Sequence, residues 1–436
     1  MTLSNLLRLF ADCRCTRLYG KALAENDNSK NQIYLAGDLE ALNILPSQKI
    51  YAQNTKSGPS FKARLDFSWL HPSGRLFPAP GAQFILYAQY PEVRFSGFLQ
   101  GAEEAPSELL AKRLPGRILF FGVTRDSKII GFAVGSDTKI AKEYREIYSR
   151  SERGVLVEIP LSKQSEPCGD SRLVLLRELG RIHRKGWIDS KQLSENGEVL
   201  PCTAQQCGGF TLEAELKIPK NSKAEPDFLG WEVKQYAVPS FLRSGNGRIT
   251  LMTPEPDGGF YKTLGIEGFI RRFGYKDKMG RPDRMNFGGI HKVNEASSAT
   301  GLTMKLIGYE KDKNKIKNAD GALVLETREG KPAASWSFSS ILEHWTKKHA
   351  KAVYVPSTCR KEPKWQYSYG KSVQLCEKTD ALKLLYALAK GDVFYDPGIK
   401  MENASSSKPL TKRRSQFRIS TGKIGSLYHK TEVVEV

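Results

Sequence analysis

The chain has 436 residues, of which 40% are hydrophobic, and a mean hydropathy of −0.43, values typical of a soluble globular protein with two or three domains. It contains no run of about 18 apolar residues, and its first ten residues lack the apolar stretch of a secretion signal. A membrane span is therefore not expected, and the expected location is cytoplasmic. The formal charge of +20, from 67 Lys and Arg against 47 Asp and Glu, indicates a polyanionic partner.

The positive charge is concentrated in the second part of the chain. Residues 1–170 hold 22 basic and 18 acidic side chains, a net charge of +4, whereas residues 171–436 hold 45 and 29, a net charge of +16. A polyanion such as DNA is therefore expected to contact the second part first. The alternative is a surface whose charges only keep the protein in solution.

The seven cysteines are odd in number and scattered, which argues against a disulfide framework. The two close pairs are Cys13 with Cys15 and Cys202 with Cys207. No histidine lies near either pair in sequence to complete a zinc site. Reduced thiols are expected.

The first 165 residues are predicted to form a strand-rich accessory domain. A helix is expected over residues 2–12 and another over 140–149, and the runs 116–123 and 128–134 are predicted to form a hairpin. Further strands are predicted at 33–35, 49–52, 63–67, 83–88, 93–99 and 154–160. Many short strands with few helices indicate a small barrel or pseudobarrel.

The polar segment 162–169 is predicted to be a linker, so the second domain is expected to span residues 166–436. The strand predicted at 247–253 is expected to lie beside residues 232–234. Helices are predicted from Asp170 or Ser171 to Lys185, over 211–216, after Ser337 or Ser339, and over 380–389 with an end at Gly391, and strands at 321–326 and 352–355.

The motif with the clearest chemical meaning is Asp227-x-x-x-x-Glu232-x-Lys234. Side chains alternate along a strand, so Glu232 and Lys234 are expected on one face, with Trp231 and Val233 on the other. If a turn at Gly230 brings Asp227 alongside, the two carboxylates can hold a hard divalent cation while the lysine acts on an attacking water. Such a site suits phosphodiester hydrolysis. The alternative is three charges on a solvated edge.

In this context the chain resembles the MvaI/BcnI type of restriction endonucleases, which are related in fold to the MutH mismatch-repair nickase. The resemblance covers most of residues 171–436 and rests on separated blocks that occur in the same order. These blocks are 179–187, 211–213, 226–234, 251–254, 272–277, 336–338, 391–393 and 416–419.

The resemblance implies an α/β (α+β) fold of the MutH-like nuclease kind, with a mixed central sheet, and Mg²⁺-dependent cleavage of double-stranded DNA. Transferred to matching positions, it makes Asp227 and Glu232 the metal ligands. It makes Lys234 the residue that positions or helps to deprotonate water, and Glu213 a helix glutamate that supports the site. The alternative for Glu213 is a solvated helix residue.

DNA recognition is predicted in the basic run 408–423, which holds six cations and no acid. The resemblance matches Arg418 to an arginine that reads bases and places Arg413 and Arg414 in a recognition loop. An arginine fork fits guanine O6 and N7, so a G·C-containing site is expected. The alternative for these residues is phosphate contact or solvated surface. Further phosphate contacts are predicted at Arg271, Arg272, Arg281 and Arg284.

The chain also departs from the family pattern. The loop 396–400 lacks a clear counterpart to a second base-reading arginine found in one branch of the family, and Thr253 stands where the other branch has histidine. The family suggests a recognition site of the CC-N-GG kind, and the specific bases stay open.

The sequence therefore predicts a type II restriction endonuclease that acts as a monomer, nicks the two strands in turn and has a cognate DNA methyltransferase encoded nearby. A MutH-like repair nickase or a modification-dependent endonuclease is the second hypothesis, and a non-enzymatic DNA-binding protein is the third. The domain at residues 1–165 is interpreted as a DNA-binding effector module. Alternatives for it are a protein-interaction module, a purely structural module or a reader of modified bases.

Overall fold

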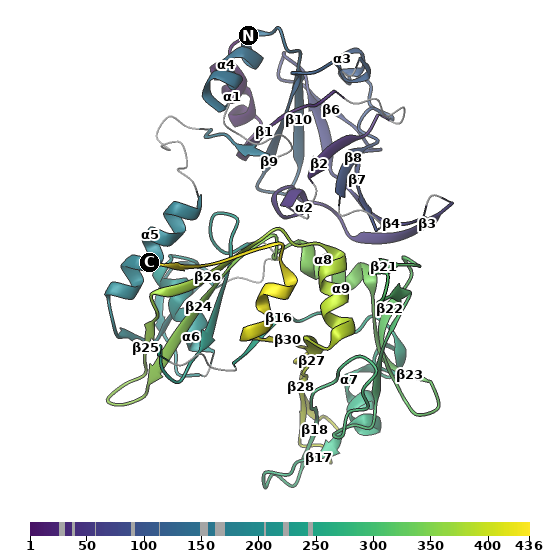
Figure 1. Cartoon of the computed structure of the whole chain (residues 1–436), viewed down its shortest axis with the longest axis vertical. Helices are drawn as coiled ribbons and strands as arrows, with labels where there is room; N and C mark the ends of the chain where they lie inside the picture. The colour runs from purple at the N-terminus through teal and green to yellow at the C-terminus, as the bar shows by residue number, and fades with distance from the viewer. Residues whose placement is uncertain are drawn as a thin grey trace. The chain divides into compact units, whose positions relative to one another are not determined.

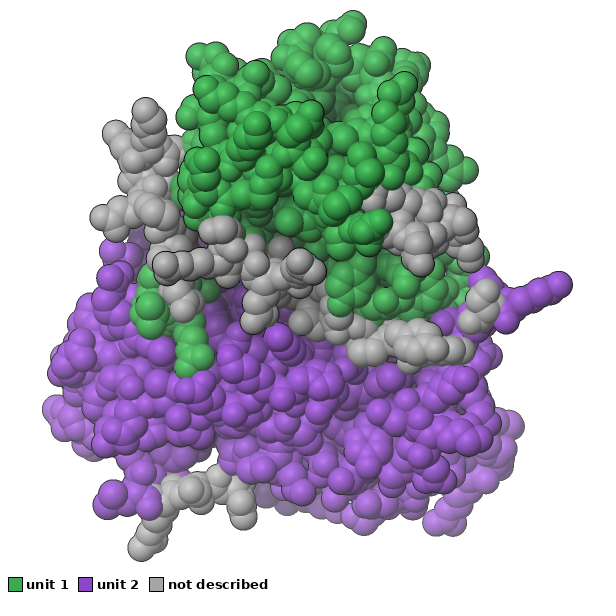
Figure 2. Space-filling view, turned by 45° about the horizontal axis from the view of Figure 1, so that its top comes forward, with its two compact units in different colours: residues 1–53, 60–174 green, residues 54–59, 175–436 purple. Residues whose placement is uncertain are grey.

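The computed structural model describes residues 1–25, 31–36, 40–56, 58–88, 92–112, 114–148, 156–161, 171–204, 206–220, 226–242 and 247–436. The chain divides into two compact units, residues 1–53 with 60–174 and residues 54–59 with 175–436 (Figure 2). The predicted linker at 162–169 lies outside the described residues. Within the described ranges, no helix is both long and apolar enough to cross a membrane.

In the first unit, helix α1 (Leu3–Asp12) begins where the sequence predicts, because the Thr2 side chain accepts a hydrogen bond from the Asn5 backbone. Its buried residues and those of α4 (Lys139–Tyr148) share one core with the first sheet. That sheet has the order β11 (Val157–Glu158), β1 (Cys15–Ala22), β9 (Ile118–Thr124), β10 (Ile129–Val134), β5 (Phe67–Leu70) and β6 (Leu76–Pro78). The predicted hairpin is confirmed as the antiparallel pair β9 and β10.

A second sheet of the same unit has the order β2 (Ile33–Ala36), β8 (Glu92–Ser96), β7 (Gln83–Tyr87), β4 (Gly58–Arg64) and β3 (Ile50–Thr55). The prediction of one strand over 63–67 is wrong. Strand β4 ends at Arg64, and the chain crosses to the first sheet through Leu65 and Asp66. Their backbones bond to Ala82 and Ile129 respectively. The strand-rich character of this part of the chain is confirmed.

The main sheet of the second unit is built around β24 (Lys351–Arg360). Strands β26 (Ser372–Glu377) and β25 (Gln366–Tyr369) pair with it antiparallel, and β15 (Glu232–Ala237) pairs with it in parallel, so the predicted mixed sheet is confirmed. Strands β31 (Lys430–Glu435) and β12 (Ile188–Asp189) complete it. Helices α5 (Ser171–Arg184) and α6 (Cys207–Glu215) lie beside this sheet (Figure 1), and their apolar residues share one core with it.

Strand β16 (Arg248–Met252) lies near β15, as predicted, but the two strands do not pair in a sheet. It pairs antiparallel with β30 (Phe417–Ser420), which pairs in turn with β27 (Val393–Tyr395). The partner of β15 is β24, which lies far along the chain. Local sequence patterns do not reveal such a long-range pairing.

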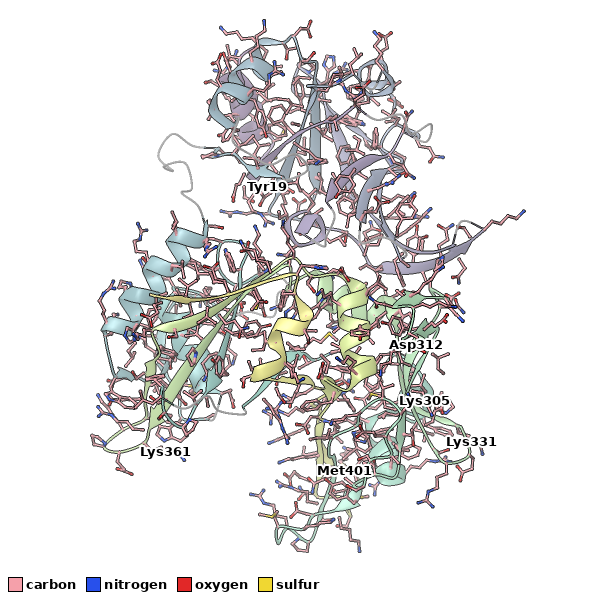
Figure 3. All side chains as sticks on the ribbon, viewed as in Figure 1. Tyr19, Lys305, Asp312, Lys331, Lys361 and Met401 are labelled. Carbon is pink, nitrogen blue, oxygen red and sulfur yellow. A yellow bond between two sulfur atoms is a disulfide. The ribbon has the colours of Figure 1, made fainter. Side chains whose placement is uncertain are left out.

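Two further sheets of three or more strands complete this unit. One has the order β17 (Tyr275–Lys276), β18 (Arg284–Gly288), β28 (Gly398–Glu402) and β29 (Leu410–Lys412), and the other β19 (Thr303–Ile307), β22 (Ala322–Glu326) and β23 (Pro332–Ser337). Helix α8 (Phe338–Thr346) begins after its N-cap Ser337, and α9 (Ala381–Lys390) ends at Gly391 with φ 73°, as predicted. In Figure 3, the label Met401 marks β28 and Lys361 marks the β24–β25 connection. The remaining elements are α2 (Glu40–Ile44), α3 (Ser107–Ala111), β13 (Lys191–Leu193), β14 (Val199–Pro201), α7 (Gly259–Phe273), β20 (Tyr309–Glu310), β21 (Lys315–Ile316) and the 3₁₀ helix η1 (Thr421–Leu427).

Cys202 and Cys207 form a disulfide, so the expectation of reduced thiols is wrong for this pair. The segment between them leads into α6 and brings their Cα atoms to 5.8 Å, within the range that a disulfide spans. The spacing of Cys202 and Cys207 in the sequence did not show that the two residues come this close. Cys13, Cys15, Cys359 and Cys376 are free thiols.

Candidate active site

A two-residue turn places Asp227 against β15. The backbones of Phe228 and Trp231 exchange hydrogen bonds of 2.9 and 2.8 Å, and both turn residues have positive φ, 47° at Leu229 and 84° at Gly230. This is the primed turn that joins two antiparallel strand ends, and glycine adopts its second position without strain. Beyond the turn, the Asp227 Oδ2 atom accepts a 3.0 Å hydrogen bond from the Val233 backbone, which fixes the carboxylate at the start of the strand.

Side chains alternate along β15 as expected. Trp231 and Val233 are buried in the core that α5 and α6 share with the sheet, whereas Glu232 and Lys234 pair on the other face, with 2.5 Å between Nζ and Oε1. The Glu232 side chain is 1% exposed and that of Lys234 is 24% exposed. A buried carboxylate is thus held by the ammonium group of a lysine whose side chain is partly exposed.

Lys348 is a second ammonium group at this site, and the sequence analysis missed it. Its Nζ lies 3.6 Å from Glu232 Oε2. The parallel pairing of Glu232 with Ala352 brings the residues just before β24 to the Glu232 carboxylate. Because that pairing is long-range, the sequence around Lys348 does not predict its contact with Glu232.

Burial and neighbouring charges shift the pKa of all three carboxylates of the site. Burial, and then the charge of Glu232, raise the pKa of Asp227 to about 6. Burial, and then Asp227, raise the pKa of Glu213 on α6 to about 7. Burial would also raise the pKa of Glu232, but Lys234 and Lys348 lower it below its usual range. Glu213, Asp227 and Glu232 therefore act on one another electrostatically.

The donor set fits a magnesium ion. Glu232 Oε2 is buried and receives no hydrogen bond, and the repulsion between Asp227 and Glu232 would be relieved by a cation. Among the described residues, no group of three or more His, Cys, Asp or Glu side chains forms a metal cluster. Mg²⁺ typically uses one or two carboxylates and completes its shell with waters and substrate phosphates, so two carboxylates suffice.

The other glutamate of α6 has a different setting. Glu215 is 4% exposed and pairs with Lys191 at 2.6 Å, Lys185 at 2.7 Å and Arg181 at 3.5 Å. These partners join α5, α6 and β13, and they lower the pKa of Glu215 although burial alone would raise it. Glu215 therefore stabilises the packing of α6, the helix that carries Glu213.

A cavity of about 370 Å³ opens beside this constellation. Both Lys234 and Lys348 line it, together with one end of β16, so a ligand in the cavity meets the two ammonium groups. The lining residues are Lys234, Thr250, Leu251, Met252, Thr253, Glu343, His344, Lys347, Lys348 and His349.

The arginines predicted to recognise DNA lie in different settings. Arg418 on β30 lies in the strand opposite Thr250, one of the cavity residues. Arg413 and Arg414, between β29 and β30, are exposed. The structure thus brings Arg418 near the cavity.

The predicted phosphate contacts lie on and after α7. Arg271 bonds to Glu267 and to the Ala404 backbone, Arg272 stacks over the Phe260 ring, and Arg281 is 66% exposed. Arg284 differs, because its side chain is 12% exposed and its donors bond to Glu402. Its guanidinium is used within the protein.

Comparison with known proteins supports a nuclease assignment. The profile of the MvaI/BcnI restriction endonuclease family matches residues 176–428, more than half of the 436 residues. The chain belongs to this family. As a member of the MvaI/BcnI family, it is a site-specific nuclease that acts on DNA.

Two solved structures are similar to this MvaI/BcnI family member. A restriction endonuclease MvaI–cognate DNA substrate complex has a TM-score of 0.46 at 17% identity and covers 61% of this chain and 98% of its own. Restriction endonuclease MvaI in the absence of DNA has a TM-score of 0.34 at 18% identity and covers 62% of this chain and 100% of its own. No curated protein matches the chain in sequence.

Proposed function

We propose that this chain is a type II restriction endonuclease that hydrolyses phosphodiester bonds of duplex DNA at a short G·C-containing site of the CC-N-GG kind, with Mg²⁺ as cofactor. The single observation that carries the proposal is the set of Asp227, Glu232 and Lys234 on one turn and strand, beside a cavity. Family membership supplies the substrate class.

In this mechanism Asp227 and Glu232 would hold the metal. Bound there, Mg²⁺ would supply positive charge against the scissile phosphate and make an attacking water more acidic. Burial lowers the pKa of Lys234, but the carboxylates of Glu232, Asp227 and Glu213 together raise it more, so the net shift is upward and the side chain stays an ammonium group at neutral pH. Its N–H donors can therefore orient the attacking water and stabilise the negative charge of the pentavalent phosphate.

Glu213 supports the site from α6. With a pKa of about 7 its carboxyl is part-protonated at neutral pH, which limits the repulsion among Glu213, Asp227 and Glu232. One such site cuts one strand at a time, so we propose that the chain acts as a monomer and nicks the two strands in turn. A cytoplasmic location and a cognate methyltransferase encoded nearby belong to the same proposal.

The test is incubation of the full chain with unmodified and with methylated phage DNA, with Mg²⁺ or with a chelator, followed by sequencing of the fragment ends. A fixed sequence at the ends of unmodified DNA, and no cutting with chelator, is the expected result. On a supercoiled plasmid, an open circle should precede the linear form. Cleavage only of methylated DNA would favour a modification-dependent endonuclease. No cleavage of either DNA would refute the nuclease proposal.

We further propose that the first unit binds duplex DNA through the outer face of the sheet β2-β8-β7-β4-β3. Tyr34, Arg94, Ile85 and Lys62 lie side by side across β2, β8, β7 and β4 on this face. Next to them, Arg64 on β4 lies opposite Gln83 on β7. The Gln83 Oε1 atom accepts a 3.3 Å hydrogen bond from the Tyr51 hydroxyl.

The same face carries a cavity of about 400 Å³, lined by Gln48, Lys49, Tyr51 and Arg64. Glu92, the acid among the described residues of these five strands, pairs with Arg94 at 2.8 Å. Exposed cations beside tyrosines are typical of a phosphate-binding surface.

Two substitutions on this face, Lys49→Ala with Arg64→Ala, test the proposal in the full chain. The slope of log affinity for duplex DNA against log salt should fall by about 1.8, because each phosphate contact contributes about 0.9. An unchanged slope and affinity would favour a protein-interaction or structural module instead.

A further inference from the structure

One face of the sheet β16-β30-β27 carries Arg248, an arginine that the sequence did not point to, beside the predicted Arg418. Arg418 lies opposite Thr250 on β16 and opposite Phe394 on β27. Arg248 is two residues before Thr250, so its side chain is on the same face, diagonal to Arg418. The two arginines are far apart in sequence and become neighbours only through the pairing of β16 with β30.

Asp396, just after β27, interacts with both guanidinium groups. Its Oδ2 atom lies 2.8 Å from Arg418 Nη1 and 3.6 Å from Arg248 Nη1. Arg418 Nη2 also donates to the backbone carbonyl of Arg248, at 3.2 Å. These contacts tie the two arginines to one carboxylate and to each other, and the pair of cations exceeds the single anion by one charge.

The exposure of the three side chains differs in a way that suits ligand binding. Asp396 is 15% exposed, Arg418 27% and Arg248 47%. The Arg248 guanidinium lies 5.8 Å from the centroid of the Phe394 ring, which packs beneath it. At 3.6 Å its contact with Asp396 is an ion pair and not a hydrogen bond, so its N–H donors stay accessible to a ligand while the group is held in place.

The cluster adjoins the candidate active site. Thr250, the neighbour of both arginines on this face, lines the cavity that Lys234 and Lys348 also line. DNA whose scissile phosphate lies at Lys234 would therefore pass this sheet face. Arg248 and Arg418 are therefore placed to contact bases next to the cut. They lie on the sheet itself, unlike Arg413 and Arg414 in the exposed loop.

We propose that Arg248 is a specificity-determining residue that reads one guanine in the major groove, beside Arg418, and that Asp396 is the positioning residue for both forks. The proposal rests on the proposed restriction function. A fork that is already fixed loses less freedom on binding, and its two parallel donors match guanine O6 and N7.

The experiment sequences the fragment ends that Arg248→Ala and the wild type cut from unmodified phage DNA. We expect Arg248→Ala to relax the site at one G·C base pair, with discrimination there reduced roughly ten- to hundredfold. Arg248→Lys should not restore it, because an ammonium group lacks the bidentate fork. The matched control is Arg177→Ala, on a 71% exposed arginine that pairs with Glu178 on α5, which should leave the site unchanged.

Three outcomes would overturn the proposal. The first is an unchanged site and an unchanged melting temperature for Arg248→Ala, which shows no role for this residue. The second is a uniform loss of cutting at all sequences that Arg248→Lys restores, which marks a phosphate contact. The third is a lower melting temperature of both variants with an unchanged site, which marks a structural role. If the wild type itself cuts no DNA, the proposed function fails, and that result is distinct from all three.

Discussion

The second unit holds two groups of charged side chains whose surroundings are opposite. At β15 the central group is a carboxylate, Glu232, that is 1% exposed and held between two ammonium groups. At the sheet β16-β30-β27 the most exposed group is the guanidinium of Arg248, while Arg418 and the carboxylate of Asp396 are more buried and bonded to each other. The first arrangement fixes charge inside the protein, and the second presents donors outward.

This difference has an energetic consequence. Charges in a buried site interact through a low effective dielectric, whereas exposed charges are screened by water and salt. Changes at Glu232 or Lys234 should therefore have large effects on the chemical step. Changes at the arginines should have moderate effects that appear in affinity and in choice of sequence.

The largest effect is expected for Lys234→Ala. It removes the ammonium group that pairs with Glu232 at 2.5 Å, so the rate of cleavage should fall by about 10²- to 10⁴-fold, while sequence-specific binding is kept. Single-turnover cleavage and gel-shift binding measure the two effects. The matched control is Lys347→Ala, a cavity lysine that pairs with Glu343 and not with Glu232. Normal cutting by Lys234→Ala would refute its role.

The second effect concerns the stability of the protein at low pH, which should depend on His291 next to β27. His291 is buried, exchanges backbone hydrogen bonds with Tyr395 and contacts Thr300 at 2.8 Å. Burial lowers its pKa to about 4, although Gly289, Tyr395 and the charge of Asp396 oppose the shift. Its pKa is about 6.5 when unfolded. The folded protein thus binds the proton less well, so stability is unaffected above pH 6.5 and is lost as pH falls toward 4.

That loss should reach up to about 3 kcal/mol. Melting temperatures between pH 7 and pH 4 measure it, and His291→Gln should flatten the dependence. The flattening is partial, because burial also lowers the pKa of His349 to about 4. A pH dependence identical in wild type and His291→Gln would show that His291 has no such linkage.

The contrast between the two groups also explains what the sequence could predict. The family assignment is confirmed. Glu232 and Lys234 are two residues apart on one strand, and Asp227 is joined to them by a turn that Gly230 allows, so local rules sufficed for their geometry, while their roles stay predictions. The local helix and strand patterns likewise located α8 and α9.

Features that depend on long-range pairing escaped prediction. Lys348 reaches Glu232 only because β24 pairs in parallel with β15, and Arg248 reaches Asp396 only because β16 pairs with β30. For the same reason, local patterns placed β16 near β15 but did not show that β24 is the sheet partner of β15. Loop closure over such separations leaves no periodic trace in the sequence.

The third effect is expected for Arg418→Ala. Loss of a guanidinium that is held by Asp396 at 2.8 Å should reduce discrimination at one base pair by about 1–3 kcal/mol. Competition binding of the cognate duplex against singly substituted duplexes measures it. A uniform loss of affinity for all duplexes would instead make Arg418 a phosphate contact. Arg248 would then be the one base-reading arginine proposed for this sheet face.

The smallest effect is expected for Lys348→Gln. Lys348 lies 3.6 Å from Glu232 and its side chain is 29% exposed, so solvent screens the pair and the expected cost is about 1 kcal/mol, or roughly fivefold in cleavage rate. Because Lys234 still holds the other oxygen of Glu232, cutting should persist at the same sequence. A rise of the Mg²⁺ concentration should recover part of the rate if Lys348 serves only to keep Glu232 ionised. A loss as deep as that of Lys234→Ala would instead place both ammonium groups at the reacting phosphate.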